Sequence, residues 1–123
     1  MTKISEGQEL WHPSAARREQ AELTRFLTWL ADERGHRFDG YRDLWRWSVS
    51  DVPGFWQALW DYFGILHDGE IDAVLTNDPM PRTRWFTGTR VNYAEHVLRH
   101  ETTGDPSRTM IRHTSELRPD IED

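Results

Sequence analysis

The sequence contains no cysteine and only one lysine, and each shortage excludes a class of chemistry. Without cysteine, the chain forms neither disulfides nor thiolate metal sites. The single lysine, Lys3, lies within residues 1–9, which we expect to form a loose N-terminal segment. A mechanism that depends on a buried and positioned lysine is therefore not expected in this chain.

Long apolar runs are missing as well. No stretch approaches the roughly 20 apolar residues that cross a bilayer, and the first residues lack the apolar core of a secretory signal. The formal net charge of -6 opposes binding to the phosphates of a nucleic acid. We therefore expect no membrane partner, no nucleic-acid partner and a cytoplasmic location.

Aromatic residues are abundant instead, and they crowd into residues 43–65, DLWRWSVSDVPGFWQALWDYFGI. Such a cluster can line a ligand site, stack on nucleic-acid bases or fill a core. Base-stacking surfaces mix aromatic with basic residues, whereas aspartates flank this stretch. The choice between a ligand site and a core depends on the spacing of the aromatics.

The first predicted helix covers residues 14–34. Ser14 is a suitable N-cap, and Gly35 is a suitable residue to end the helix. Between them, four apolar residues recur with the i, i+3, i+4, i+7 spacing of an amphipathic helix: Leu23, Phe26, Leu27 and Leu30.

Two shorter helices are expected next, at residues 40–48 and 51–64. Asp39 can cap the first of them, Ser50 can cap the second, and Gly64 ends the second. Phe55, Leu59 and Phe63 recur here at i, i+4 and i+8, beside Trp56 and Trp60 at i, i+4. This spacing favours packing in a core over contact with a ligand. The predicted core comprises ten residues: Leu23, Phe26, Leu27, Leu30, Trp45, Phe55, Trp56, Leu59, Trp60 and Phe63.

The second half of the chain is expected to be less regular. Residues 67–90 are rich in turn formers, and only Ala73–Leu75 is expected to be briefly extended. Asn92 begins NYAE, close in form to a capping box, and opens a helix at 91–100. A strand is expected at Thr109–Thr114, without an obvious partner strand. The predicted fold class is mainly α, with several amphipathic helices, irregular loops and at most a short C-terminal β-strand.

Two histidines, His96 and His100, lie four residues apart on the last predicted helix and could face one metal ion. No glutamate follows His96, so the HExxH metalloprotease motif is absent. The spacing assigns no third ligand, although His113 could lie nearby. We favour two surface histidines near a helix C-terminus, and we predict no metal site.

A second candidate is the stretch PRTRWFTGTR, in which three arginines surround two aromatic residues. The guanidinium groups could bind an anion or a nucleotide phosphate. Alternatively, the stretch is a loop held against a neighbour by its aromatics and arginines, and we favour this interpretation. The sequence has no GxxxxGK[ST] loop, no strand followed by GxGxxG and no GxSxG elbow, so we predict no catalytic or cofactor-binding residue. The candidate contact residues are Arg82, Arg84, Trp85, Phe86 and Arg90.

The motifs follow one another in a characteristic order along nearly the whole chain. They are LWHPS (10–14), LTRFLTWL (23–30), YRDLWRWSVSD (41–51), FWQALWDYFGI (55–65), MPRTRWFTGTRVNYAEHVLRH (80–100) and TSELRP (114–119). In this order they resemble the N-terminal region of the acetoacetyl-CoA synthetases, adenylate-forming enzymes related to acetyl-CoA synthetase.

The resemblance implies a part of a larger enzyme. Such enzymes join acetoacetate to coenzyme A through an acyl-adenylate, using ATP and magnesium. Their phosphate-binding loop and adenylation lysine lie in later domains, so the resemblance carries no catalytic, cofactor-binding or metal residue over to this chain. It implies an incomplete N-terminal segment of an α/β enzyme, with a helical segment at 10–108 and the start of the large domain at 109–123. The implied partner is that large domain, contacted through PRTRWFTGTR. A stand-alone module whose tryptophans bind a small ligand is the alternative.

Overall fold

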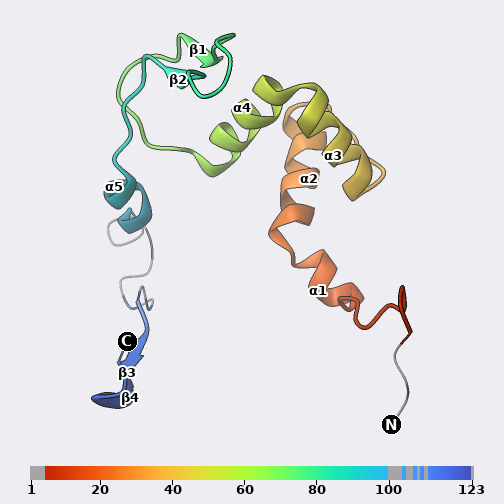
Figure 1. Ribbon diagram of the computed structural model, residues 1–123, viewed down its shortest axis with the longest axis vertical. Helices are drawn as coiled ribbons and strands as arrows, with labels where there is room; N and C mark the ends of the chain where they lie inside the picture. The colour runs from red at the N-terminus through yellow and green to blue at the C-terminus, as the bar shows by residue number, and fades with distance from the viewer. Residues whose placement is uncertain (1–4, 100–103, 105–106, 108, 110, 123) are drawn as a thin grey trace. The chain divides into compact units, whose positions relative to one another are not determined.

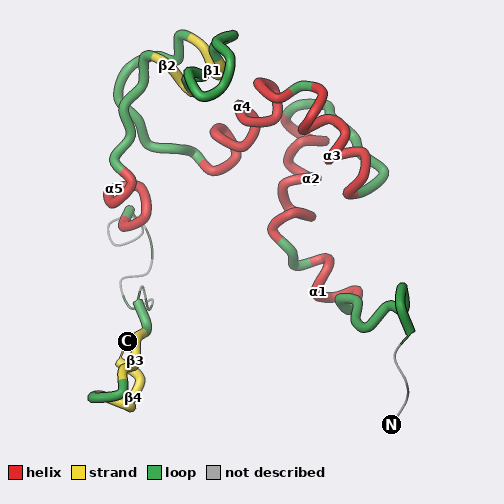
Figure 2. Tube along the Cα trace, viewed as in Figure 1, coloured by secondary structure: helices red, strands yellow, loops and turns green. Residues whose placement is uncertain are grey.

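The computed structural model describes residues 5–99, 104, 107, 109 and 111–122. The chain divides into two compact units, residues 1–64 and 65–123. The first unit is helical, and all the described strands lie in the second unit (Figures 1 and 2). The prediction of a mainly α fold is confirmed, with more β structure than the sequence indicated. No described helix combines the length and the apolar character that crossing a membrane requires.

The described residues of the first unit form four helices: α1 (Ala15–Glu19), α2 (Glu22–Glu33), α3 (Tyr41–Ser50) and α4 (Val52–Phe63). The prediction of one continuous helix at 14–34 is wrong, because the chain breaks at Ala21, whose backbone is extended with ψ at 142°. Ser14 does cap α1, accepting a hydrogen bond from the Arg17 amide. α1 is a single short turn with no buried residue, so no core contact holds it in line with α2.

Glycines end two of these helices, as predicted. Gly35 and Gly64 have left-handed backbones, with φ at 68° and 54°, a conformation that other residues adopt only with strain. After Gly35, the His36 amide donates to the Leu30 carbonyl at 3.0 Å. Each left-handed glycine therefore closes its helix and turns the chain.

The predicted N-caps of α3 and α4 are wrong. α3 begins after Gly40 without a side-chain cap, so Asp39 does not cap it. α4 is capped by Asp51, whose carboxylate accepts a hydrogen bond from the Gly54 amide at 3.0 Å. Ser50 is the last residue of α3, and its hydroxyl donates back to a carbonyl of that helix. A carboxylate is a stronger acceptor than a hydroxyl, and α4 accordingly begins one residue later than predicted.

The core of the first unit is small and aromatic. α4 packs on both α2 and α3. The Phe26 ring meets the rings of Tyr62 and Phe55 edge to face, with centroids 5.0 and 6.4 Å away, and stacks on Trp29 at 6.1 Å. The buried hydrophobic side chains are Phe26, Leu30, Leu44 and Ala58.

The structure corrects part of the predicted core. Phe26 and Leu30 are buried, and four others are half-buried: Leu27, Phe55, Leu59 and Trp60. Four of the ten residues are instead exposed: Leu23, Trp45, Trp56 and Phe63. Helical spacing identifies every apolar face of a helix, but so small a unit can bury only one face of each.

The second unit contains β1 (Ala73–Leu75), β2 (Trp85–Thr87), α5 (Tyr93–Leu98), β3 (His113–Ser115) and β4 (Arg118–Glu122). The extended segment Ala73–Leu75 is confirmed as β1, and Asn92 caps α5 by accepting a hydrogen bond from an amide of its first turn. α5 is shorter than the predicted helix at 91–100, and residue 100 lies outside the described residues.

The strand predicted at Thr109–Thr114 is confirmed only at its C-terminal end, residue 110 lies outside the described residues, and the expectation that the strand has no partner is wrong. β3 begins only at His113, and it pairs antiparallel with β4 through a turn at Glu116 and Leu117. β4 consists of RPDIE, whose charges and proline hide the alternating pattern by which a strand is recognised. The partner strand was therefore present but invisible to pattern analysis.

Candidate functional site

The predicted contact cluster PRTRWFTGTR lies on an antiparallel hairpin of the second unit. β1 pairs with β2 in a register that sets Leu75 opposite Trp85. Outside the two strands, Asp68 and Arg90 form a further antiparallel bridge, in which each amide donates to the other residue's carbonyl at 2.9 Å. The hairpin therefore fixes the backbone of the cluster near both of its ends.

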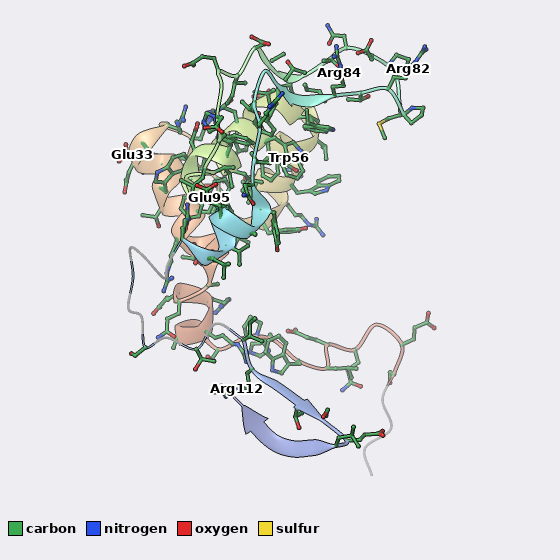
Figure 3. All side chains as sticks on the ribbon, turned by 90° about the vertical axis from the view of Figure 1, so that its left-hand side faces the viewer. Glu33, Trp56, Arg82, Arg84, Glu95 and Arg112 are labelled. Carbon is green, nitrogen blue, oxygen red and sulfur yellow. The ribbon has the colours of Figure 1, made fainter. Side chains whose placement is uncertain are left out.

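The loop of the hairpin carries the first two arginines. The Arg82 amide donates to a carbonyl of the preceding turn at 2.9 Å. Arg84 is held on both sides by Thr76, which donates its amide to the Arg84 carbonyl and accepts the Arg84 amide on its hydroxyl, both at 3.0 Å. Figure 3 shows Arg82 and Arg84 at the same end of the hairpin, and both residues are exposed. Two exposed positive charges are thus presented close together.

The two aromatics of the cluster differ in burial. Trp85 is exposed, whereas Phe86 is half-buried. Phe86 has a left-handed backbone with φ at 44°, which costs on the order of 1 kcal/mol for a residue with a side chain. The hairpin therefore exposes the Trp85 ring more than the Phe86 ring.

Two glycines allow the base of the hairpin to close. Gly69 and Gly88 have left-handed backbones, with φ at 85° and 88°. A β-carbon on Gly69 would lie 2.3 Å from the Gly88 carbonyl oxygen, and one on Gly88 would lie 2.3 Å from the Glu70 carbonyl oxygen. No other residue fits at either position without moving the backbone.

The third arginine does not form an anion site. Arg90 lines a shallow hollow of about 270 Å³ together with two carboxylate residues, Asp68 and Glu95. His67 and Asn92 also line the hollow. The negative charges beside Arg90 offset its attraction for a phosphate. Arg90 is therefore poorly placed to bind a phosphate, and the choice between a contact loop and an anion site for Arg82 and Arg84 stays a prediction.

The histidine pair is not brought together as a metal site in the part of the chain that the structure describes. His96 accepts a hydrogen bond on Nδ1 from the Leu66 amide at 3.3 Å, which ties α5 to the segment before the hairpin. His100 lies outside the described residues, and His113 begins β3. Within the described residues, no group of three or more His, Cys, Asp or Glu side chains could hold a metal ion.

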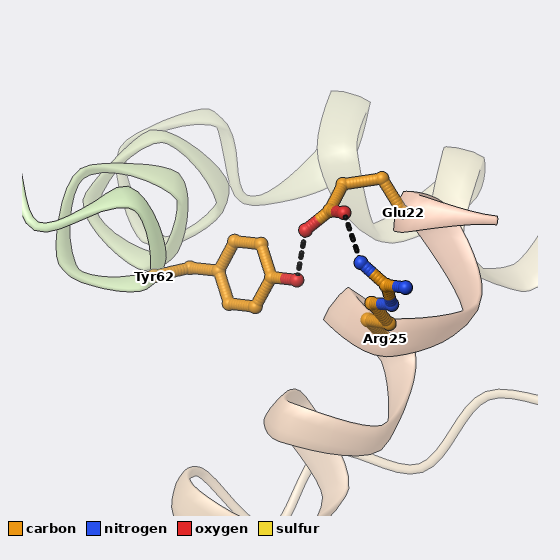
Figure 4. Close-up of polar contacts among 3 residues, drawn as sticks. All are labelled: Glu22, Arg25 and Tyr62. Atoms are coloured by element: carbon orange, nitrogen blue, oxygen red, sulfur yellow. Dashed lines mark hydrogen bonds and ion pairs between the residues drawn. The ribbon is translucent and has the colours of Figure 1, made fainter. Parts of the chain in front are cut away.

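A polar cluster joins α2 to α4, and sequence analysis missed it. The Tyr62 hydroxyl donates to the Glu22 carboxylate, which also accepts a hydrogen bond from Arg25 at 3.3 Å (Figure 4). The hydrogen bond from Tyr62 to Glu22 raises the pKa of Tyr62 above 10.0. Burial and the negative charge of Glu22 also raise this pKa, whereas the positive charge of Arg25 lowers it. Every member has a partner, so the cluster acts as a structural link between the two helices.

A second link lies near the other end of α2. Arg34 and Asp61 form an ion pair, and Asp61 also accepts a hydrogen bond from Gln57 at 2.9 Å. Arg34 lies over the Trp29 ring at 5.5 Å. Arg34 and Asp61 are 27 positions apart in the chain, and no spacing rule predicts such a pair.

The most distinctive feature of the surface is its exposed aromatic residues. Large apolar side chains are exposed on α3, α4, the β1–β2 hairpin and α5. Burial of such side chains stabilises a protein, so their exposure on each of the two units marks surfaces suited to contact with other protein. The exposed aromatics on these elements are Tyr41, Trp45, Trp56, Phe63, Trp85 and Tyr93.

Comparison with known proteins shows which family this chain resembles. The family described as Acetyl-coenzyme A synthetase N-terminus matches residues 41–97. Acetoacetyl-CoA synthetase of Danio rerio is 32% identical over 123 residues, which cover 97% of this chain and 17% of that protein. Malonamoyl-CoA synthetase of Penicillium aethiopicum is 37% identical over 91 residues, covering 72% of this chain and 12% of that protein.

The comparison with solved structures agrees with the sequence comparison. The solved structure of acetoacetyl-CoA synthetase from Streptomyces lividans matches with a TM-score of 0.72 and 41% identity, over 78% of this chain and 15% of that one. The chain spans 17% of the Danio rerio relative's length and a similar share of the others. In sequence and in fold, the chain therefore matches the N-terminal region of the acetoacetyl-CoA synthetases, as the order of its motifs indicated.

Proposed function

We propose that the chain is the structural N-terminal segment of an acetoacetate–CoA ligase and packs on the nucleotide-binding domain of that enzyme. The observation that carries the proposal is the match to 15% of the Streptomyces lividans enzyme at 41% identity. The exposed aromatics support it, because they need a protein partner to cover them.

The whole enzyme would make acetoacetyl-CoA from acetoacetate, ATP and CoA through an acyl-adenylate, with magnesium bound to the nucleotide. In this proposal the chain itself contributes no catalytic group, since the sequence has no phosphate-binding loop and no lysine beyond Lys3. The choice of acid would also lie elsewhere, because the same region resembles both an acetoacetyl-CoA and a malonamoyl-CoA synthetase. The predicted boundaries at 10–108 and 109–123 and the cytoplasmic location remain predictions.

The β1–β2 hairpin is proposed as one contact with the large domain. Its exposed surface combines the arginines of the loop with Trp85, and such mixed aromatic and arginine surfaces are enriched at protein interfaces. The backbone of the hairpin is fixed by the Asp68–Arg90 bridge, so little ordering would be needed on docking.

A chimera tests the proposal. This chain replaces the matching segment of the Streptomyces lividans acetoacetyl-CoA synthetase, and formation of acetoacetyl-CoA from acetoacetate, ATP and CoA is measured. We expect the chimera to be active and the same enzyme without the segment to be inactive. The isolated chain should release neither AMP nor pyrophosphate. A folded but inactive chimera, or turnover by the isolated chain, would contradict the proposal.

A stand-alone binding module is the second candidate. The observation in its favour is a hollow of about 350 Å³ on α3 that Tyr41 and Trp45 line with two arginines. Titration of the isolated chain with small sugars, nucleotides and aromatic acids, followed by tryptophan fluorescence, distinguishes the two. A saturable response to a free ligand supports the module, whereas the segment should respond to the large domain alone.

A further inference from the structure

Helix α3 is apolar on two sides, and only one of them belongs to the core. On the inner side, Leu44 is buried and Trp47 packs edge to face on the Phe55 ring, with centroids 5.7 Å apart. On the outer side lie three apolar residues, Tyr41, Trp45 and Val49, which are 67%, 53% and 56% exposed.

The three exposed residues form one continuous face, here named the outer face of α3. They follow at i, i+4 and i+8, and at about 100° of rotation per residue they fall within roughly 80° of one another. By the same geometry Trp47 projects about 160° from Trp45, and Leu44 about 100° from it, so the buried residues lie on a different side of the helix. A helix that is apolar on both sides is normally covered on both sides, so the outer face requires a partner.

The charged residues beside the outer face indicate what chemistry a partner surface must offer. Arg42 and Arg46 line the hollow on this face with Tyr41 and Trp45. Arg46 is engaged, since it pairs with Asp43 at 2.6 Å. The side chain of Arg42 makes no hydrogen bond or ion pair with any other residue that the structure describes. The face therefore offers apolar contact and one uncommitted positive charge, although the chain as a whole is negative.

We propose that the outer face of α3 docks on the large domain of the ligase, at an apolar surface that offers a carboxylate to Arg42. This assignment rests on the proposed function and specifies its contact. The Streptomyces lividans relative has 85% of its length outside the matched region, which supplies enough protein to cover the face. A second copy of this chain fits less well, because a symmetric dimer through α3 would bring two Arg42 charges together.

Variants of the chimera test the assignment. Trp45→Ala removes the central ring and Arg42→Glu reverses the free charge, while Arg18→Glu, on exposed helix α1, is the matched control for charge reversal. Limited proteolysis measures how fast the segment is released from the folded enzyme. Central interface tryptophans and arginines often contribute 2 kcal/mol or more, so we expect release to accelerate at least about tenfold for both test variants. Arg18→Glu should leave the rate unchanged, and Arg42→Lys should retain most of the protection.

Each outcome has a distinct meaning. If the unmodified chimera is inactive or its segment is released at once, the proposed function fails and the docking face fails with it. If the unmodified chimera is intact and the test variants behave like Arg18→Glu, only the docking face is wrong. The assignment is also overturned if Trp45→Ala lowers the melting temperature of the isolated chain as much as it destabilises the chimera. The docking assignment is likewise overturned if Trp45→Ala abolishes self-association of the isolated chain without affecting the chimera.

Discussion

Replacing Phe26 tests the aromatic core of the first unit most sharply. The side chain is buried, and its ring contacts the rings of Trp29, Phe55 and Tyr62 with centroids 5.0 to 6.4 Å away. Phe→Ala in a core costs about 3–5 kcal/mol, and a unit of this size rarely has more stability than that to lose. Phe26→Ala should therefore leave the first unit unfolded, and the graded substitution Phe26→Leu is the informative one.

Phe26→Leu keeps most of the apolar volume and removes the three ring contacts. Each such contact contributes about 0.5–1.5 kcal/mol beyond simple burial, so losing three of them should lower the free energy of unfolding by about 1.5–4.5 kcal/mol. The assay is urea unfolding of the whole chain, followed by tryptophan fluorescence and near-ultraviolet circular dichroism. The control is Trp56→Leu, because Trp56 is 43% exposed and meets the Phe55 ring at 5.9 Å, so that its replacement should cost less, about 0.5–1.5 kcal/mol in the isolated chain. Equal losses for the two substitutions would refute the placement of Phe26 at the centre of the core.

Three further predictions concern the polar link, the hairpin and the caps. Tyr62→Phe should lower the free energy of unfolding by about 0.5–1.5 kcal/mol, measured in urea. Because folding raises the pKa of Tyr62 above 10.0, its contribution is complete below pH 10 and is lost as the pH rises further, a loss that Tyr62→Phe should not show. Gly88→Ala should expose the hairpin amides to hydrogen exchange, whereas Gly35→Ala, equally left-handed but with open space around it, should affect only its own helix end. Asp51→Ala should lower the melting temperature through a loss of about 0.5–2 kcal/mol, and Ser50→Ala should change it little; the reverse order would restore Ser50 as the cap.

Features that depend on a few neighbouring residues could be predicted from the sequence. The helix ends at Gly35 and Gly64 and the cap at Asn92 follow from chemistry that acts within one turn. The break at Ala21 could not be predicted, because it depends on α1 having nothing to pack against. Where two candidate caps are adjacent, as Ser50 and Asp51 are, sequence rules cannot decide between them, because they place the start of a helix only to within about one residue.

Burial was harder to predict than helicity. Spacing places Trp45 and Trp56 on apolar stripes, but it cannot say which stripe faces the core. Ala58 was missed because a small residue at a close helix contact carries little apolar signal, although it is buried. The candidate contact residues were predicted as a set, and the hairpin that holds them was recognisable only in its first strand, Ala73–Leu75.

The central claim is that this chain serves as the N-terminal segment on which a complete acetoacetate–CoA ligase depends. The most direct measurement is the rate of acetoacetyl-CoA formation by the chimera, compared with the same Streptomyces lividans enzyme lacking the segment. The account predicts substantial activity in the chimera and none above background in the shortened enzyme, with both preparations monodisperse. Equal activity in the two, or a folded chimera without activity, would contradict it.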